Sequence, residues 1–305
     1  MTRGMEAGSG DGSRRGGIDT ARGAGGAGMD RLAGKVALIT GAARGQGRSH
    51  AVRLASEGAD IIAVDRCADI DTVNYPLATP DDLAETVKLV EATDHRIVAT
   101  QADVRDLAAM TAAVDAGVAE LGGLDIVVAN AGIAGYAPVM TLEADAWTNM
   151  IDVNLNGVFW TVKAALPHLL NGGRGGSIVL TSSAAGLRAM ENSAHYIAAK
   201  HGLVGLMKAL ALELGRHRIR VNTVHPTTVN TEMVQNPMTK ELFLPGHVDP
   251  PQERFAKVAQ SLNVLPEPWA EPEDISAAVA FLCSDEARLV TGAAFPVDAG
   301  MSIRW

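Results

Sequence analysis

Residues 35–47 read KVALITGAARGQG, and this stretch decides the fold. Its first half is a run of apolar residues, which is typical of a strand buried on both faces of a parallel sheet. The second half is a turn in which Gly41, Gly45 and Gly47 let backbone N–H groups approach a diphosphate at a helix N-terminus. We therefore expect a strand, a glycine-rich turn and a helix that runs to about Gly58.

A second apolar run, DIIAVD at residues 60–65, ends in an acidic residue. A carboxylate at the end of the second strand of a βαβ unit accepts hydrogen bonds from the ribose hydroxyls of adenosine. It also repels a 2′-phosphate, so Asp65 predicts NAD rather than NADP as the cofactor. Arg44 and Arg66 oppose this prediction, because either guanidinium could pair with a 2′-phosphate.

Strands and helices continue to alternate along the chain. Further strands are predicted at residues 96–102, 124–129, 177–180, 220–225 and 294–297, and helices at 81–92, 107–121 and 144–170, with another that carries Tyr196. This alternation predicts a single α/β domain, residues 31–305. It is built as a Rossmann-type, doubly wound parallel sheet of about seven strands with helices on both faces.

A second motif, YIAAK, lies at residues 196–200. In a helix, Tyr196 and Lys200 stand on one face because they are four residues apart. A positive charge about 4 Å from a phenol is worth roughly 4 kcal/mol at an effective dielectric constant of about 20, which could lower the phenol pKa by as much as ~3 units. Ser183, just after the strand at 177–180, could hold a substrate oxygen while the tyrosine exchanges a proton with it. Taken alone, such a motif is more often an incidental feature of a surface helix.

Small and polar residues recur where the predicted strands end, and one asparagine lies inside the helix at 144–170. These residues are Asp103, Val104, Asn130, Ala131, Gly132 and Asn154. In this order, together with the glycine-rich turn, Asp65, Ser183 and the Tyr196–Lys200 pair, they resemble the short-chain dehydrogenase/reductase family. The resemblance extends from about Leu32 to the C-terminus.

The resemblance implies catalytic roles for four residues. Tyr196 is the acid/base, and Lys200 both lowers its pKa and binds the nicotinamide ribose. Ser183 orients the substrate oxygen, and Asn154 holds a water that links Lys200 to solvent. The implied cofactor site consists of Gly41, Arg44, Gly45, Gln46, Gly47, Asp65, Arg66, Asp103, Val104, Asn130, Ala131, Gly132, Tyr196, Lys200, Val229 and Thr231.

Residues 66–80 form an insertion beside the adenine end of the cofactor site. Ile70, Val73, Tyr75 and Leu77 make it apolar enough to pack down, although a surface loop without function is the usual alternative. The sequence of the insertion, together with HPTTVNT at residues 225–231, resembles the mycofactocin-coupled dehydrogenases, which include carveol dehydrogenase-like enzymes. That resemblance implies a tightly held NAD beneath the loop, reoxidised in place by the redox cofactor mycofactocin as external electron acceptor.

Residues 231–268 correspond to the segment that covers the substrate in this family. Its apolar residues, Met233 and Phe255 among them, serve either as a lid over an apolar alcohol or as part of the core. We expect a hydrophobic secondary alcohol, for example a terpenoid such as carveol. One departure precedes this segment, because the family's usual Pro-Gly is Pro226-Thr227, and a β-branched residue avoids dihedrals that are open to glycine.

Composition excludes several other classes of protein. The net charge of -9 over 305 residues, without a basic stripe, argues against nucleic acid as a partner. Cys67 and Cys283 give no disulfide framework and indicate a reducing cytoplasm. No apolar run approaches the ~18 residues of a membrane span, and the histidines lack metal-ligand spacing. Residues 1–30 are rich in glycine and poor in large apolar side chains, so they are predicted to be a disordered extension.

The helix after Lys200 carries an apolar stripe that predicts packing on the sheet. The stripe consists of Leu203, Leu206, Met207, Leu210, Ala211 and Leu214. The family resemblance implies that this helix also pairs with its copy, and we expect a homotetramer built as a dimer of dimers. The predicted function is NAD-dependent interconversion of an alcohol and its ketone. The alternatives are an NADPH-dependent ketoreductase of the same fold and a non-catalytic NAD-binding sensor.

Overall fold

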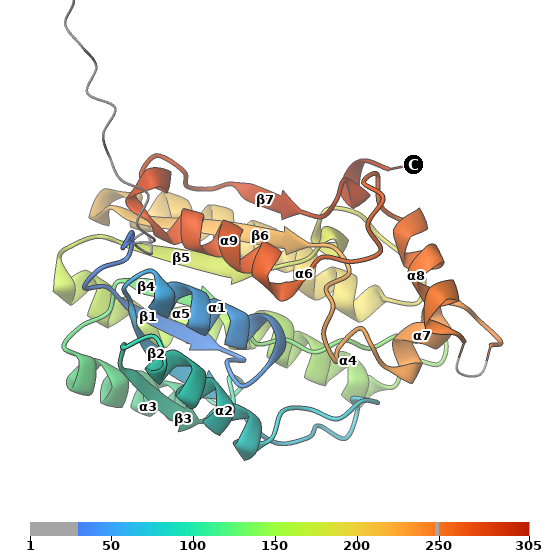
Figure 1. The fold of residues 1–305 in the computed structure, drawn as a ribbon, viewed down its shortest axis with the longest axis horizontal. Helices are drawn as coiled ribbons and strands as arrows, with labels where there is room; N and C mark the ends of the chain where they lie inside the picture. The colour runs from blue at the N-terminus through green and yellow to red at the C-terminus, as the bar shows by residue number, and fades with distance from the viewer. Residues whose placement is uncertain (1–29, 248–249, 305) are drawn as a thin grey trace, which may run out of the picture.

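The computed structural model describes residues 30–247 and 250–304, so the predicted disordered extension lies outside the described residues apart from Asp30. Within these ranges seven parallel strands form one sheet in the order β3-β2-β1-β4-β5-β6-β7. The strands are β1 (Val36–Thr40), β2 (Asp60–Asp65), β3 (Ile97–Gln101), β4 (Ile126–Ala129), β5 (Gly176–Thr181), β6 (Ile219–Pro226) and β7 (Ala294–Val297). This architecture confirms the predicted doubly wound α/β fold (Figure 1).

Helices cover both faces of the sheet. They are α1 (Gly45–Ser56), α2 (Pro80–Glu91), α3 (Leu107–Leu121), α4 (Ala144–Ile151), α5 (Gly157–Gly172), α6 (Ala194–Leu214), α7 (Pro237–Phe243), α8 (Gln252–Ser261) and α9 (Pro272–Cys283). Side chains of α1, α2 and α9 pack on one face of the sheet, and those of α3, α5 and α6 pack on the other.

The central strand β1 illustrates why the strands are apolar without interruption. Val36 and Leu38 point into the core shared with α3, α5 and α6, whereas Ala37 and Ile39 point into the core shared with α1 and α9. Because helices cover both faces, every residue of β1 is buried. Each large aliphatic side chain buried in this way contributes roughly 1.5–3 kcal/mol to folding.

The connections between strands change direction between β1 and β4. The chain passes outward from β1 to β2 and β3, and then crosses back so that β4 to β7 follow on the other side of β1. Loops that leave β1 and β4 therefore separate, and a crevice opens at the carboxyl ends of the strands. The helices α4, α7 and α8 gather at this end of the molecule (Figure 1).

The helix predicted at residues 144–170 is interrupted by a π-helical turn. This turn, Asp152–Asn156, separates α4 from α5. Within it, the Asn154 side chain accepts a hydrogen bond from the backbone N–H of Ile133 and donates one to the Ile133 carbonyl, both at 2.8 Å. The extra residue of a π turn lets Asn154 reach the loop after β4, and such turns often occur at functional sites.

Thr227, which replaces the family's usual glycine, fits without backbone strain. It is not among the described residues with positive φ. Its N–H donates to the Val297 carbonyl at 3.2 Å, which continues the pairing of β6 with β7. Its hydroxyl donates to Asn263 Oδ1 at 3.0 Å, so the threonine ties the end of β6 to the segment at 231–268.

Candidate active site

The glycine-rich turn between β1 and α1 is closed so tightly that a side chain is excluded at Gly47. A Cβ atom there would lie 1.9 Å from the carbonyl oxygen of Gly41. Gly41 has a φ of 67°, and a Cβ on it would come within 2.9 Å of Ala131 Cα. The turn therefore presents bare backbone to the crevice, as its sequence predicts.

Asn130 and Thr40 hold the carboxyl ends of neighbouring strands together. Thr40 Oγ1 accepts hydrogen bonds from the N–H groups of Asn130 and Ala131, both at 3.1 Å. The Asn130 amide donates to the Thr40 carbonyl at 3.1 Å and accepts from Thr181 Oγ1 at 3.3 Å. Asn130 thus links β1, β4 and β5 where the crevice opens, a role that its sequence position did not reveal.

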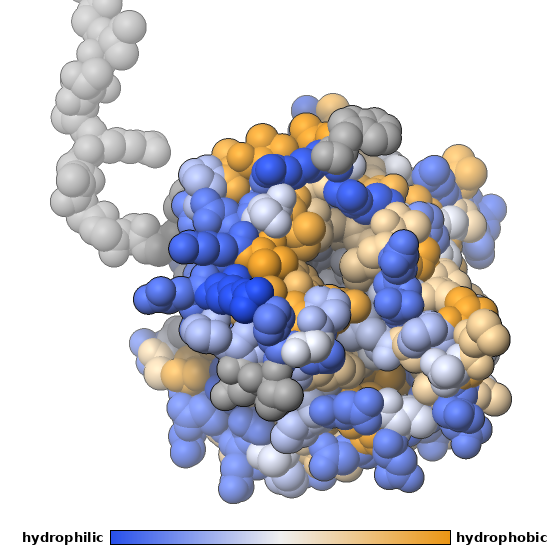
Figure 2. Space-filling model, turned by 90° about the vertical axis from the view of Figure 1, so that its right-hand side faces the viewer, coloured by the Kyte–Doolittle hydropathy of each residue, from blue (hydrophilic) through white to orange (hydrophobic). Residues whose placement is uncertain are grey.

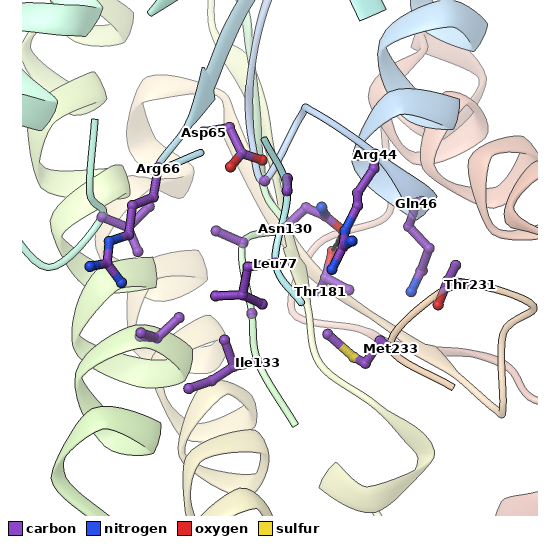
Figure 3. Close-up of a pocket in the computed structure, with 18 of the residues that line it drawn as sticks. Arg44, Gln46, Asp65, Arg66, Leu77, Asn130, Ile133, Thr181, Thr231 and Met233 are labelled. Atoms are coloured by element: carbon purple, nitrogen blue, oxygen red, sulfur yellow. Dashed lines mark hydrogen bonds between the residues drawn. The ribbon is translucent and has the colours of Figure 1, made fainter. Parts of the chain in front are cut away.

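One cavity brings together most of the residues predicted to bind the cofactor (Figure 3). The predicted residues that line it are Gly41, Arg44, Gly45, Gln46, Gly47, Asp65, Arg66, Asp103, Val104, Asn130, Ala131, Gly132, Tyr196, Lys200 and Thr231. Val229, Asn154 and Ser183 do not line this cavity. Val229 is instead buried at 3% exposure and forms an isolated parallel bridge with Ala270.

The carboxylate of Asp65 is oriented by the backbone on both sides. Its Oδ2 accepts from the Ala43 N–H and its Oδ1 from the Cys67 N–H, both at 3.0 Å. These bonds fix the carboxylate at the end of β2, where it lines the cavity. An acceptor in this place suits ribose hydroxyls and disfavours a phosphate.

The two arginines that oppose the NAD prediction are both engaged by protein groups. Arg44 Nη2 donates to the Pro76 carbonyl of the insertion at 2.5 Å. Arg66 Nε lies 3.3 Å from Asp103 Oδ2. Figure 3 places the two guanidinium groups on opposite sides of the pocket, with Asp65 between them in this view. Their engagement weakens the case for a 2′-phosphate site.

Asp103 lies between the guanidinium groups of Arg66 and Arg105 at the end of the cavity that is predicted to hold adenine. Burial raises the pKa of this carboxyl, but the hydrogen bonds and charge of Arg105 and the charge of Arg66 outweigh it, so the pKa lies below its usual value. Arg105 Nη2 approaches Asp103 Oδ2 to 2.7 Å, and its Nη1 donates to Asn149 Oδ1 at 2.6 Å. The ionised Asp103 is therefore held rigidly between β3 and α4.

Tyr196 and Lys200 lie one turn apart on α6, as predicted. Lys200 Nζ is 5.7 Å from the centroid of the Tyr196 ring and donates to the Thr181 carbonyl at 2.8 Å. Burial lowers the pKa of Lys200 to about 8. Burial also raises the pKa of the Tyr196 phenol, opposed by a hydrogen bond with Ser183. The predicted lowering of the phenol pKa by Lys200 is therefore wrong for this structure, because burial dominates the environment of the phenol.

Ser183 is positioned by a histidine to which sequence analysis gave no role. Ser183 Oγ accepts from the Ala185 N–H at 3.1 Å at the start of a short 3-10 turn. The Ser183 carbonyl lies 2.7 Å from His225 Nδ1, which must donate because a carbonyl only accepts. His225 Nε2 then accepts from Thr223 Oγ1 at 2.8 Å, and burial lowers the pKa of the ring, which keeps it neutral. The only sequence signal for this role was a histidine at the end of the strand beside that of Ser183.

The insertion packs down, as its apolar residues predict. Ile70 and Tyr75 are 6% and 5% exposed, and Val73 and Leu77 pack partly buried against the same core. Ile70, Tyr75 and Leu77 also line the cavity. The segment therefore forms one wall of this cavity rather than a free surface loop.

Two polar contacts tie the insertion to the opposite side of the crevice. The phenol oxygen of Tyr75 accepts from the Ala134 N–H, in the loop after β4, at 3.0 Å. Thr72 Oγ1 accepts from the Asn149 side chain of α4 at 3.1 Å. With the Arg44 contact to Pro76, the insertion is attached to three separate elements around the cavity.

Apolar residues of the segment at 231–268 serve both predicted purposes: some form a core, and one lines the cavity. Phe255 is fully buried, and its ring centroid lies 5.4 Å from that of Phe243 and 6.0 Å from that of Trp269, so this part has a small core of its own. Met233 lines the cavity (Figure 3). Figure 2 shows apolar side chains around a hollow on the face that contains α7 and α8.

The residues around the cavity fit a dinucleotide. Gln46 Oε1 and Arg66 Nη1 are buried without a hydrogen-bond partner in the part of the chain that the structure describes. Such a group costs about 1–3 kcal/mol unless a ligand or water pairs with it. A diphosphate on the Gly47 turn and an adenosine between Asp65 and Asp103 would supply polar partners on both sides of the cavity.

Comparisons with known proteins identify the family of the chain. A family model described as enoyl-(acyl carrier protein) reductase matches residues 41–302. A short-chain type dehydrogenase/reductase of Mycolicibacterium smegmatis is 60% identical over 277 residues, which cover 90% of this chain and 99% of that protein. The (-)-trans-carveol dehydrogenase of Rhodococcus erythropolis is 54% identical over 278 residues, which cover 90% of this chain and 100% of that protein. The solved structure of carveol dehydrogenase from Mycobacterium avium in complex with NAD is 57% identical with a TM-score of 0.88, and the match covers 90% of this chain and 99% of that one.

These similarities define the class of protein as an oxidoreductase. The chain belongs to the short-chain dehydrogenase/reductase family. The finer resemblance to mycofactocin-coupled enzymes stays a prediction. Within residues 30–247 and 250–304, no helix has the length and apolar character that a membrane crossing requires. The same residues contain no group of three His, Cys, Asp or Glu side chains arranged to hold a metal ion.

Proposed function

We propose that this protein oxidises a hydrophobic secondary alcohol to its ketone, and catalyses the reverse reduction, with NAD as the hydride carrier. The observation that carries the proposal is that one cavity contains both the Tyr196–Lys200 pair and the Asp65 carboxylate beside a glycine-rich turn. The first can exchange a proton with an oxygen atom, and the second suits a dinucleotide without a 2′-phosphate. The relatives named as carveol dehydrogenases support an alcohol as the substrate class.

In the proposed reaction Tyr196 accepts the hydroxyl proton of the alcohol. NAD, when bound, supplies the acceptor for the hydride that leaves the carbinol carbon. Ser183 hydrogen-bonds the same substrate oxygen. His225 holds Ser183 in place by donating a hydrogen bond to the Ser183 carbonyl. The alcohol loses one proton and one hydride, and the C–O bond becomes the carbonyl of the ketone. We assign the catalytic roles to Asn154, Ser183, Tyr196 and Lys200.

We assign to Lys200 a second role, in the transfer of the proton to solvent. Its Nζ uses one hydrogen on the Thr181 carbonyl, which leaves others for a nicotinamide ribose and a water. A Cβ on Gly132 would lie 3.4 Å from Asn154 Oδ1 and 3.6 Å from Lys200 Nζ, so the bare glycine leaves space between the two side chains. The Asn154 amide is already bonded to Ile133, and we place a water on the backbone carbonyls of the π turn.

Lys200→Met is expected to lower kcat at least about a hundredfold, because the positive charge beside the reacting phenol is lost. The same variant is expected to be at least as stable as the wild type at pH 7, because it removes a buried cation. Burial lowers the pKa of Lys200 from 10.5 to about 8, so the charged form destabilises the fold below pH 8 and this penalty fades as the pH rises towards 10.5. The gain in stability should therefore be largest below pH 8.

Initial rates and thermal unfolding of refolded, nucleotide-free protein at several pH values check this prediction. Lys88→Met, at an exposed position of α2 on the opposite face of the sheet from α6, is the control and should change neither rate nor stability. A Lys200→Met protein with wild-type kcat would remove Lys200 from the mechanism. Clear destabilisation at pH 7 would contradict the cost assigned to its burial.

The test of the proposed function begins with mass spectrometry of small molecules released when the purified protein is denatured. About one equivalent of NAD per chain is expected. A panel of secondary alcohols, with (-)-trans-carveol among them, is then offered together with an artificial electron acceptor. Oxidation of apolar secondary alcohols supports the proposal, whereas bound NAD without turnover of any alcohol favours the sensor alternative.

Asp65→Asn is expected to raise the bound NADP-to-NAD ratio about tenfold or more, because it removes a negative charge from the place of a 2′-phosphate. The amide oxygen still accepts from the Ala43 or the Cys67 N–H, so the turn keeps its shape. The measurement refolds nucleotide-free protein with equal amounts of NAD and NADP and then quantifies what is bound. Two results together would instead favour the NADPH-dependent ketoreductase: the wild type binds NADP, and Asp65→Asn leaves the NADP-to-NAD ratio unchanged.

We further propose that NAD is held tightly beneath the insertion at 66–80 and is reoxidised in place, with mycofactocin as the external electron acceptor. The buried Ile70 and Tyr75 and the contacts of the insertion around the cavity support tight binding. We propose a terpenoid such as carveol as the alcohol, with residues 231–268 as its lid. Met233 in the cavity wall and the names of the relatives support this choice.

We propose that the subunits assemble through α6 into a homotetramer that is a dimer of dimers. Leu212 on α6 is 87% exposed and Phe159 on α5 is 38% exposed, so this side of the molecule carries apolar side chains. Gly205 is open to this side, whereas Gly202 serves packing within the chain, since a Cβ there would lie 3.1 Å from Leu155. A cytoplasmic location is also proposed, and it is supported by the two free, buried cysteines.

A further inference from the structure

Two of the three tyrosines of the chain, Tyr75 and Tyr196, line the same cavity. Tyr75 belongs to the insertion, Tyr136 to the loop after β4, and Tyr196 to α6. Burial and the charge of Tyr196 raise the pKa of Tyr75 to about 12, and the same two causes raise the pKa of Tyr136. The phenols of Tyr75 and Tyr136 are therefore neutral at pH 7.

Tyr75 is the point where the insertion touches the loop after β4. Its ring is 5% exposed and lines the same cavity as Tyr196 and Lys200. Its oxygen accepts from the Ala134 N–H at 3.0 Å, and within the described residues its hydroxyl hydrogen makes no further bond. The contact thus depends on one oxygen atom, which can be removed without disturbing the ring.

The segment at residues 133–137, which we name the β4 loop segment, is attached at three points. Ile133 is held by Asn154, and Ala137 N–H donates to the Asn192 carbonyl just before α6 at 2.8 Å. A Cβ on Gly135 would lie 3.3 Å from His195 Nε2, so the segment packs against the turn of α6 that carries Tyr196. The third attachment, at Ala134, is the one that comes from the insertion.

We propose that Tyr75 is a positioning residue for the alcohol. Its bond to Ala134 holds the β4 loop segment, which includes Tyr136, in the conformation that lines the alcohol site. This bond exists only while the insertion is packed down. This inference rests on the proposed function. Because coupling between two binding events is reciprocal, a bound alcohol or ketone must hold the insertion closed by the same factor. One buried hydrogen bond supports a coupling of about three- to tenfold.

Tyr75→Phe tests the inference, because it removes the oxygen and leaves the packed ring. The KM for (-)-trans-carveol is expected to rise about three- to tenfold, while kcat changes less than about twofold. Amide hydrogen exchange at Ala134 is expected to become faster, while exchange within α6 is unchanged. Release of labelled NAD from the wild type should slow about three- to tenfold when carvone, the ketone of carveol, is present, and this dependence should vanish in the variant.

Thr72→Val is the matched control, because it cuts the polar tether to Asn149 and leaves the Ala134 contact intact. It is expected to speed release of NAD without changing the KM for (-)-trans-carveol. The inference would be overturned if Tyr75→Phe had the same KM for (-)-trans-carveol and the same amide exchange at Ala134 as the wild type. An equal rise in KM in Thr72→Val would also overturn it, because general loosening of the insertion would then suffice. If the wild type oxidises no alcohol, the proposed function fails, and faster exchange at Ala134 in Tyr75→Phe still supports the link between insertion and loop.

Discussion

Replacement of Tyr196 by phenylalanine is expected to lower kcat for alcohol oxidation by about a hundred- to ten-thousandfold, the range that proton transfer by a positioned side chain commonly contributes. The variant loses the phenol oxygen, which we propose accepts the hydroxyl proton. The rest of the site should be retained, because the aromatic ring stays packed near Lys200, whose Nζ is anchored on the Thr181 carbonyl and not on the phenol. Bound NAD is therefore expected to remain at about one equivalent per chain.

Single-turnover kinetics of the purified variant, followed by nucleotide analysis of the same sample, check both parts of this prediction. Wild-type circular dichroism together with retained NAD would show that the loss of rate is chemical and not a loss of structure. Turnover within about tenfold of the wild type would remove Tyr196 from the role of catalytic base. Loss of the nucleotide together with the rate would mean that the phenol oxygen holds the cofactor, which contradicts the division of roles proposed here.

The strands, the helices α1, α2, α3 and α6 and the place of the crevice could be predicted because their signals are local. β1 and the turn to Gly47 are encoded in thirteen consecutive residues of the printed sequence, 35–47, and the remaining strands follow as apolar runs. A parallel sheet needs cover on both faces, so the alternation of strands and helices determines the fold class. The cavity follows from the fold, since the predicted residues lie at the carboxyl ends of the strands, in the loops there and in the first turns of α1 and α6.

What the sequence did not reveal depends on contacts between distant segments. The π turn at Asp152–Asn156 accompanies the bonds of Asn154 to Ile133, twenty-one residues away, and no propensity encodes it. The engagement of Arg44 by Pro76 likewise depends on where the insertion packs. Sequence spacing placed both arginines near Asp65 correctly but could not say which groups they bind.

The pKa of Tyr196 shows a different limit of the sequence. Spacing by four residues predicts that Lys200 is close, and it is close. The direction of the phenol pKa depends on how much water the site excludes, and burial raises it. Burial also lowers the pKa of the lysine that was expected to supply the charge. Desolvation depends on all the segments that surround the site, so it cannot be predicted from the Tyr196–Lys200 motif alone.

Removal of the insertion is expected to convert a protein that retains its nucleotide into one that exchanges it freely. If NAD lies beneath the insertion as proposed, its release requires the insertion to open, which exposes Ile70 and Tyr75, now 6% and 5% exposed. Each such side chain contributes roughly 1.5–3 kcal/mol when fully buried, so opening slows release on the order of a hundred- to ten-thousandfold. The bonds of Pro76 and Tyr75 to the opposite wall add to this barrier.

The structure sets the limits of the deletion. Thr79 caps α2, since its hydroxyl accepts from the Asp82 N–H at 3.2 Å and its own N–H donates to the Asp82 carboxylate at 2.8 Å. Cys67 orients Asp65 through its N–H group. The deletion should therefore remove residues 69–77 and join the ends with a short glycine bridge, so that both the cap and the Asp65 carboxylate are kept. A full-length protein with Ile70 and Leu77 replaced by serine is the matched control, and its rate of release should be intermediate.

The intact protein, offered (-)-trans-carveol and free NAD, is expected to oxidise about one equivalent of alcohol per site and then stop, because the reduced nucleotide cannot leave. An artificial acceptor that reoxidises the bound nucleotide should restore turnover. The deletion variant should turn over steadily with free NAD and without the acceptor, and it should lose its nucleotide on dialysis. Steady turnover of the intact protein with free NAD alone, at the rate of the deletion variant, would refute retention by the insertion. The proton-transfer roles of Tyr196 and Lys200 would be unaffected by that result, because they do not depend on how the nucleotide leaves.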